Sequence, residues 1–300
     1  MANHSRLRRR FDRAVGYRLQ AAAVWLFIQA MRLMSPEMAS NLGGGLLRWL
    51  GPKLSRSRRM RRDIERSLPQ LEPARVDAIV TAAWDNLGRT FAEYVHLDRI
   101  AANYAAHVEL TGGEHLQALA GDGRPGIVFT GHFANWELCA MTCARFGLDL
   151  TYVFRKPNNP YVAQMLAQAR APLGGTMVPK GREAARGLMA AIRAGGHVGL
   201  LIDQKLNEGP ALPFLGRDAR TGTVLADLAL RYDAPAVPIR VVRLGAARFK
   251  VTVLPPVVFA RTGDLKADTL AAMRKANALL GDWVREDPGQ WMWQHRRWPD

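Results

Sequence analysis

The sequence predicts an α/β fold with a largely buried sheet, because short β-rich runs alternate with helical stretches from Ala105 onward. The predicted strands cover residues 127–129, 150–154, 198–202, 236–244 and 249–254. Apolar residues recur at helical spacing between them, over residues 135–146, 161–171, 182–194 and 224–232. Hydrophobic residues make up 48% of the 300 residues, which is enough for a sizeable core and excludes a disordered chain.

The elements have recognisable ends. A helix is expected over residues 71–97, where Val76, Val80 and Leu87 lie on one face. Gly131 ends the strand that begins near residue 127, and a pair of glycines ends the helix of residues 182–194. Thr221, Gly222 and Thr223 are typical of a helix start, here that of residues 224–232.

The first 66 residues predict a membrane-anchoring region. They hold 15 Lys and Arg but only 4 Asp and Glu, which is most of the net charge of +16. The apolar run of residues 21–28 is too short to span a bilayer, for which about 20 residues are needed. A helix over residues 11–34 with Trp25 and Phe27 is instead typical of the membrane interface, and a polybasic cluster follows it: Lys53, Arg56, Arg58, Arg59, Arg61 and Arg62. A soluble helix packed on the domain is the alternative.

Neither a nucleic-acid partner nor a zinc site is expected from the composition. A nucleic acid is not expected, because aromatic residues do not alternate with the basic ones as a stacking platform requires. Cys139 and Cys143 have no second pair of Cys or His nearby, so a zinc site is not expected either. The two thiols are predicted to be buried, in a reducing compartment.

The segment of residues 126–137 carries the chemistry. His132 follows directly after a buried strand, and catalytic groups of such sheets lie at the carboxyl ends of strands. Glu137 comes five residues later and could reach back to fix the imidazole tautomer. His132 would then act as a general base that removes a proton from a substrate hydroxyl. A capping His and a surface Glu are the alternative.

Several sequence blocks resemble one family in order. Residues 131–137, G-H-F-A-N-W-E, are similar to the H-x4-D/E motif of the glycerolipid acyltransferase superfamily, and more closely to that of the late acyltransferases of lipid A biosynthesis. The resemblance extends to Asn86–Arg89 with Glu93, and to residues 154–160, 202–204, 213–216, 221–223 and 288–298. It implies a central mixed sheet flanked by helices, with an N-terminal amphipathic membrane helix on an acyltransferase domain of residues 67–300.

The resemblance also implies an activity. The enzyme would transfer an acyl chain from acyl carrier protein to the hydroxyl of a 3-hydroxyacyl chain on a lipid A precursor. It would work at the cytoplasmic face of the bacterial inner membrane, against an anionic lipid surface, with neither metal nor cofactor. Three alternatives stay open: another glycolipid or a lysophospholipid as acceptor, a non-catalytic basic membrane-binding protein, and a thioesterase.

Further candidate residues come from the same blocks and from one helix start outside them. Arg155 ends a strand beside His132 and could polarise the thioester carbonyl, hold a phosphate or form a structural ion pair. Asp203 ends another strand and could orient His132, bind the acceptor or cap a helix. Asn159 is expected to shape its loop by an Asx turn or to donate to the oxyanion. The remaining candidates for substrate binding are Lys180 and Arg182 beside a helix start, and Arg296 and Arg297 in the tryptophan-rich tail.

Overall fold

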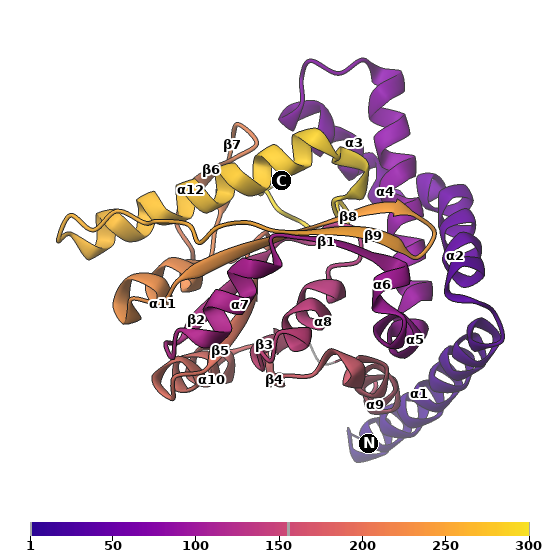
Figure 1. Cartoon of the computed structure of the whole chain (residues 1–300). Coiled ribbons are helices and arrows are strands. Elements are labelled where there is room, and N and C mark those ends of the chain that lie inside the picture. Colours follow the sequence, from indigo (N-terminus) through magenta and orange to yellow (C-terminus); the bar gives the residue numbers. More distant parts are fainter. Residues whose placement is uncertain (1, 155–156, 300) are drawn as a thin grey trace.

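The computed structural model describes the backbone of residues 2–154 and 157–299, with the side chains of these residues except 2–14 and 182. Its centre is a sheet of seven strands in the order β1-β9-β8-β2-β5-β3-β4 (Figure 1). All neighbouring strands are parallel except β8 and β9, so the sheet is mixed, as predicted. The strands are β1 (Val108–Thr111), β2 (Gly126–Thr130), β3 (Leu150–Phe154), β4 (Thr176–Pro179), β5 (His197–Leu201), β8 (Ala236–Gly245) and β9 (Arg248–Val253).

Helices cover both faces of the sheet, because successive side chains of its strands point to opposite sides. In β2, Ile127 and Phe129 belong to one buried cluster and Val128 to the other. The first cluster is completed by α3 (Ser55–Ser67), α4 (Pro73–Glu93), α10 (Arg182–Arg193), α11 (Val224–Tyr232) and α12 (Leu265–Glu286). The second is completed by α5 (Leu97–Ala102), α6 (Tyr104–His107), α7 (Gly113–Gly121) and α8 (Glu137–Arg145). The central strands are therefore buried on both sides.

The sequence did not predict β1 and β4 of the sheet, nor the helices α3, α5, α6 and α7. Two further features were not predicted either. One is α12, whose start is capped by Asp264 through hydrogen bonds from the backbone nitrogens of Lys266 and Ala267. The other is the separate antiparallel hairpin of β6 (Ala211–Phe214) and β7 (Arg217–Arg220). The strands of the hairpin are four residues long, too short for a convincing alternation of polar and apolar residues.

The N-terminal helices lie at one edge of the molecule (Figure 1). α2 (Pro36–Leu50) packs along α4, and the two backbones touch where Gly43 meets Gly88: a Cβ on Gly43 would lie 2.4 Å from the Gly88 carbonyl oxygen. α3 contributes Met60 and Ile64 to the core. α1 (Ala2–Arg32) extends from this body along α9 (Pro160–Arg170). Among the described residues, no helix has the length and apolar character needed to cross a bilayer.

Candidate active site

The pairing of β2 with β5 brings His132 and Asp203 together. Thr130 and Leu201 are register partners in these parallel strands, and each candidate lies two residues beyond its partner residue. Gly131 is required by space at this point, because a Cβ there would lie 2.9 Å from the Phe133 ring and 3.1 Å from Asp203 Oδ2. The two strand ends therefore place a buried imidazole and a buried carboxylate side by side.

Asp203 holds His132 by two hydrogen bonds. Its Oδ1 lies 2.7 Å from His132 Nδ1, and its Oδ2 accepts from the His132 backbone nitrogen at 2.7 Å. The indole nitrogen of Trp291 donates to the same Oδ2 at 2.8 Å. Burial alone would raise the pKa of Asp203, but attraction to His132 and these hydrogen bonds outweigh it and hold the pKa below its usual range. An ionised Asp203 only accepts, so Nδ1 of His132 carries the proton.

The other ring nitrogen of His132 is thereby left as an acceptor. The side-chain amide nitrogen of Gln204 lies 3.2 Å from His132 Nε2 and donates to it. Trp136 meets the imidazole edge-on, with ring centroids 4.9 Å apart. A substrate hydroxyl that is to reach Nε2 must therefore displace the Gln204 amide.

Glu137 does not make the expected contact with His132. Its Oε1 accepts instead from the Tyr94 hydroxyl, from Arg170 at 2.5 Å and from the Trp136 indole at 3.1 Å. The physical reason lies in the loop before it: Ala134 has a φ of +45°, and the chain then enters α8 with Glu137 in its first turn, beside α4 and α9. The prediction that Glu137 pairs with His132 is wrong for this structure, and Asp203 takes that place.

Burial and the neighbouring carboxylate of Glu137 raise the pKa of Tyr94 well above its usual value. Tyr94 therefore stays a neutral donor to Glu137. Arg170 also lies over the Tyr94 ring, and its guanidinium faces Glu137 from α9. Tyr94, Glu137 and Arg170 thus form a largely buried group that ties the turn directly after α4 to α8 and α9, next to the His132 loop.

The loop between His132 and Glu137 is held by α4. The Thr90 hydroxyl donates to the Ala134 carbonyl at 2.9 Å, and the Asn135 amide donates to Glu93 at 3.0 Å. Glu93 is fully buried and is paired with Arg243. Asn86 and Glu93, which the family resemblance singled out, therefore lie in a helix whose buried polar face fixes the loop.

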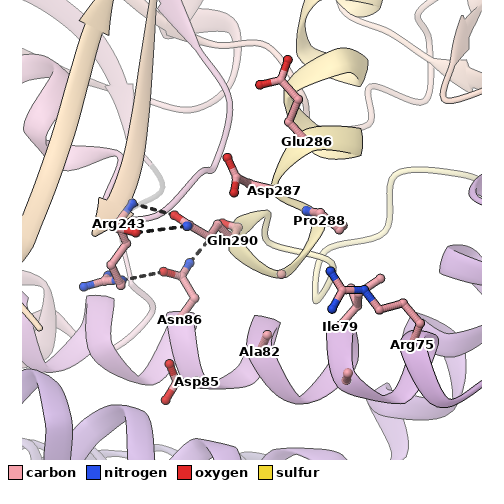
Figure 2. A pocket seen from close by; sticks show the side chains of 12 residues that line it. Arg75, Ile79, Ala82, Asp85, Asn86, Arg243, Glu286, Asp287, Pro288 and Gln290 are labelled. Atoms are coloured by element: carbon pink, nitrogen blue, oxygen red, sulfur yellow. Dashed lines mark hydrogen bonds between the residues drawn. The ribbon is translucent and has the colours of Figure 1, made fainter. Parts of the chain in front are cut away.

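Figure 2 shows a polar pocket behind this loop, between α4, β8 and the end of α12. Asn86, Arg243 and Gln290 line it and bond to one another: Asn86 accepts from Arg243 at 2.9 Å and donates to the Gln290 carbonyl at 3.1 Å, and Gln290 accepts from the Arg243 backbone at 2.6 Å. Neither His132 nor Asp203 lines this pocket. We interpret it as part of the support of the loop, since Asn86, Arg243 and Gln290 already satisfy one another.

The remaining predicted residues are spread over the domain. Arg155 lies outside the described residues. Asn159 caps α9 by accepting from the Tyr161 backbone at 3.1 Å, and its amide donates to the Tyr17 carbonyl of α1 at 2.7 Å, which favours the structural role. The side chain of Lys180 is exposed, and Arg182 begins α10.

The C-terminal tail packs against Asp203. Trp291 contacts its carboxylate, and His295 Nε2 lies 3.2 Å from its backbone carbonyl oxygen. Arg296 is exposed, whereas Arg297 is 0% exposed and donates to the Arg220 carbonyl and the Thr221 hydroxyl, both at 2.8 Å. Burial lowers the pKa of Arg297 to about 10. Arg297 therefore has the structural role that the sequence had left as one of two readings.

Gln204 and Trp291 complete the site but were not singled out from the sequence. Both occur in blocks that resemble the family, so their presence was visible, but their contacts with His132 and Asp203 depend on the fold. No cluster of three or more His, Cys, Asp or Glu in the described part of the chain could hold a metal ion. The arrangement supplies a buried, oriented imidazole whose Nε2 lone pair accepts from the Gln204 amide, and displacement of that amide would leave Nε2 suited to proton abstraction from a hydroxyl.

Comparison with known proteins gives one match that carries weight. The family model described as bacterial lipid A biosynthesis acyltransferase matches residues 10–300. Curated proteins gave no match. A solved structure similar to this chain is the 1-acyl-sn-glycerophosphate acyltransferase PlsC from Thermotoga maritima, at 12% identity and a TM-score of 0.36 over 67% of this chain and 87% of that one. That likeness is too low to add to the argument, and the family match over nearly the whole length decides: the chain belongs to the bacterial lipid A biosynthesis acyltransferase family.

Proposed function

We propose that the enzyme esterifies a hydroxyl of a lipid A precursor with an acyl chain from acyl carrier protein, and that His132 is the base. The observation that supports this proposal best is the bond of His132 Nδ1 to the buried carboxylate of Asp203 at 2.7 Å. This bond leaves Nε2 as the proton acceptor. The negative charge of the Asp203 carboxylate stabilises the imidazolium that forms when His132 takes the proton.

The reaction balances without a covalent enzyme intermediate. The acceptor hydroxyl takes the place of the Gln204 amide at His132 Nε2 and gives its proton to that nitrogen. Its oxygen forms a C–O bond to the carbonyl carbon of the acyl thioester, and the C–S bond then breaks. The imidazolium returns the proton to the leaving sulfur, so that the products are the ester and the free thiol of the carrier protein.

The buried thiols are poor candidates for an acyl-enzyme intermediate. Burial raises the pKa of Cys139 to about 12 and that of Cys143 well above its usual value, so both are protonated at neutral pH. A thiol in that state is a weak nucleophile. Direct attack by the acceptor hydroxyl therefore remains the mechanism that we propose.

The other assignments follow the family. Arg155 is proposed as the group that stabilises the oxyanion or contacts a phosphate, and Lys180, Arg182 and Arg296 as contacts for the phosphorylated acceptor. Glu137 is proposed as a positioning residue that holds the His132 loop through its contacts with Tyr94 and Arg170. The acceptor is proposed to be reached from an anionic membrane surface, at the cytoplasmic face of the bacterial inner membrane.

Acyl transfer in detergent tests the proposal. Labelled acyl carrier protein and a purified lipid A precursor are incubated with wild type or with His132→Ala. Label should appear on the lipid with wild type and fall by about 10²-fold or more in the variant. Transfer at the wild-type rate by the variant would refute the base, and transfer to a lysophospholipid in preference to the lipid A precursor would refute the acceptor. Release of free fatty acid without an acceptor would indicate a thioesterase.

A further inference from the structure

The outward face of α2 is apolar, although most amphipathic helices place their apolar face inward. Met38, Leu42, Leu46 and Trp49 are spaced by four, four and three residues, which puts them on one side of the helix. They are 60%, 48%, 52% and 65% exposed. These four residues are called the α2 stripe below.

The inward face of α2 carries small residues in place of large ones. Ala39, Ser40, Gly43 and Gly44 are buried against α4. The approach is so close that a Cβ on Gly43 would also lie 2.7 Å from Ala92 Cβ. Turning the helix to bury the α2 stripe would therefore place large side chains where only glycine fits. The outward direction of the stripe is fixed by packing.

We propose that the α2 stripe is the surface by which this protein docks on an anionic lipid bilayer. The proposed function already includes an anionic membrane as a partner, and this proposal rests on it for that partner. The new part is the surface of the protein that contacts the membrane. α2 lies at the outer edge of the molecule with α4 on its inner side (Figure 1), and the residues of the stripe are exposed. α1 also exposes large apolar residues, namely Trp25, Leu26 and Phe27.

Charge favours lipid over a second copy of the chain. Lys53 lies 3.8 Å over the ring of Trp49 at the end of the stripe, a pairing suited to the headgroup layer. Exposed cations follow in α3: Arg56, Arg58, Arg62 and Arg66. Two copies joined symmetrically through α2 would bring these like charges together, whereas an anionic surface attracts them.

Hydrogen bonds link α2 to the active-site loop through α4. Ser40 of α2 donates to Glu93 of α4 at 2.7 Å, and Glu93 accepts from Asn135 of the His132 loop at 3.0 Å. The stripe lies on the opposite face of α2, so α2 and α4, each about 10 Å across, both lie between the docked surface and the loop. Docking at this face would therefore hold the His132 loop about two helix diameters from the lipid surface.

Vesicle binding by the full-length protein tests this surface. Purified protein is exchanged from detergent into vesicles of phosphatidylcholine with or without phosphatidylglycerol, and bound protein is separated by flotation. Wild type should bind the anionic vesicles, and Leu42→Glu/Leu46→Glu should lower its partition coefficient by about 30-fold or more. Leu42→Ser/Leu46→Ser removes the apolar area without adding charge and should weaken binding in the same direction.

The matched control is Val258→Glu/Leu265→Glu. These two residues are 79% and 48% exposed, lie before and at the start of α12, and bring the same change in net charge. The control should bind within about threefold of wild type, so that its difference from the α2 variant isolates the stripe. Equal binding by the two double variants would overturn the proposal. A soluble dimer that only the α2 variants convert to a monomer, with unchanged vesicle binding, would overturn it as well.

Activity separates this proposal from the proposed function. His132→Ala should bind vesicles as wild type does, and Leu42→Glu/Leu46→Glu should keep wild-type acyl transfer in detergent micelles, where docking is not needed. If wild type binds vesicles through the stripe but shows no acyl transfer, the proposed function alone would be overturned. If wild type transfers acyl chains in micelles, but Leu42→Glu/Leu46→Glu binds vesicles as well as wild type does, the docking surface alone would be overturned.

Discussion

Replacing Asp203 by Asn tests the pairing on which the proposed chemistry rests. The new side chain has nearly the same volume and can still accept from Trp291, but it no longer carries a charge next to the imidazolium. Its amide can also donate to Nδ1 of His132, which would move the ring proton to Nε2 and block the base. Asp203 is 1% exposed and lies 2.7 Å from Nδ1, so water would not replace the lost charge.

The expected loss in kcat is about 10³- to 10⁴-fold, the order found where an orienting carboxylate of a catalytic histidine is replaced by an amide. This corresponds to about 4 to 5 kcal/mol of transition-state stabilisation. The fold should lose only about 1 to 3 kcal/mol, since one charged hydrogen-bond partner changes. The assay is acyl transfer in detergent at saturating acceptor, with the melting temperature measured on the same preparation. A loss of less than tenfold in a folded Asp203→Asn variant would refute the reasoning and return the orienting role to Glu137.

Three further outcomes are expected. Glu137→Gln leaves Arg170 buried without its anion and should cost about 3 to 5 kcal/mol of stability in a denaturant titration; an unchanged midpoint would contradict the buried pair. Gly43→Val should destabilise the protein by about 1 to 3 kcal/mol in the same titration, because the new side chain meets the backbone of α4, and Gly45→Val, which meets no neighbour, is the control. Burial lowers the pKa of His295 from 6.5 to about 4, so the unfolded chain binds its proton first and stability should fall as the pH drops from 6.5 toward 4. The melting temperature of His295→Gln should depend less on pH between 6.5 and 4 than that of wild type. The same slope in both proteins would contradict this prediction.

The central strands β2, β3, β5, β8 and β9 and about half of the helices could be predicted from local patterns, whereas β1 and β4 could not. The apolar run of β2 and the glycine after it predict a buried strand with a sharp end, and the periodic segments predict α10 and α11. The position of His132 at a strand end follows from the same local signals. The hairpin of β6 and β7 could not be found in this way, because its short strands are stabilised by α12 and the C-terminal tail, as in the contact of Phe214 with Trp291.

The partner of His132 shows where local patterns stop being sufficient. Glu137 is five residues away in the chain, and its spacing fits an orienting carboxylate as well as Asp203 does. Only the register of β2 with β5 brings Asp203 to the imidazole, and only the bend at Ala134 turns Glu137 toward Tyr94 and Arg170. Both depend on hydrogen bonds between segments that are far apart in sequence.

The sequence by itself determined the α/β class, the family and the position of His132 at the end of its strand, because each depends on residues that are neighbours in the chain. The tertiary structure decided which carboxylate contacts His132 and which side of α2 faces outward. The physical reason is the same in both cases, because the partner of a side chain is set by how strands and helices pack. The register of β2 with β5 brings Asp203 to His132, and the close glycine contact of α2 with α4 turns the α2 stripe outward.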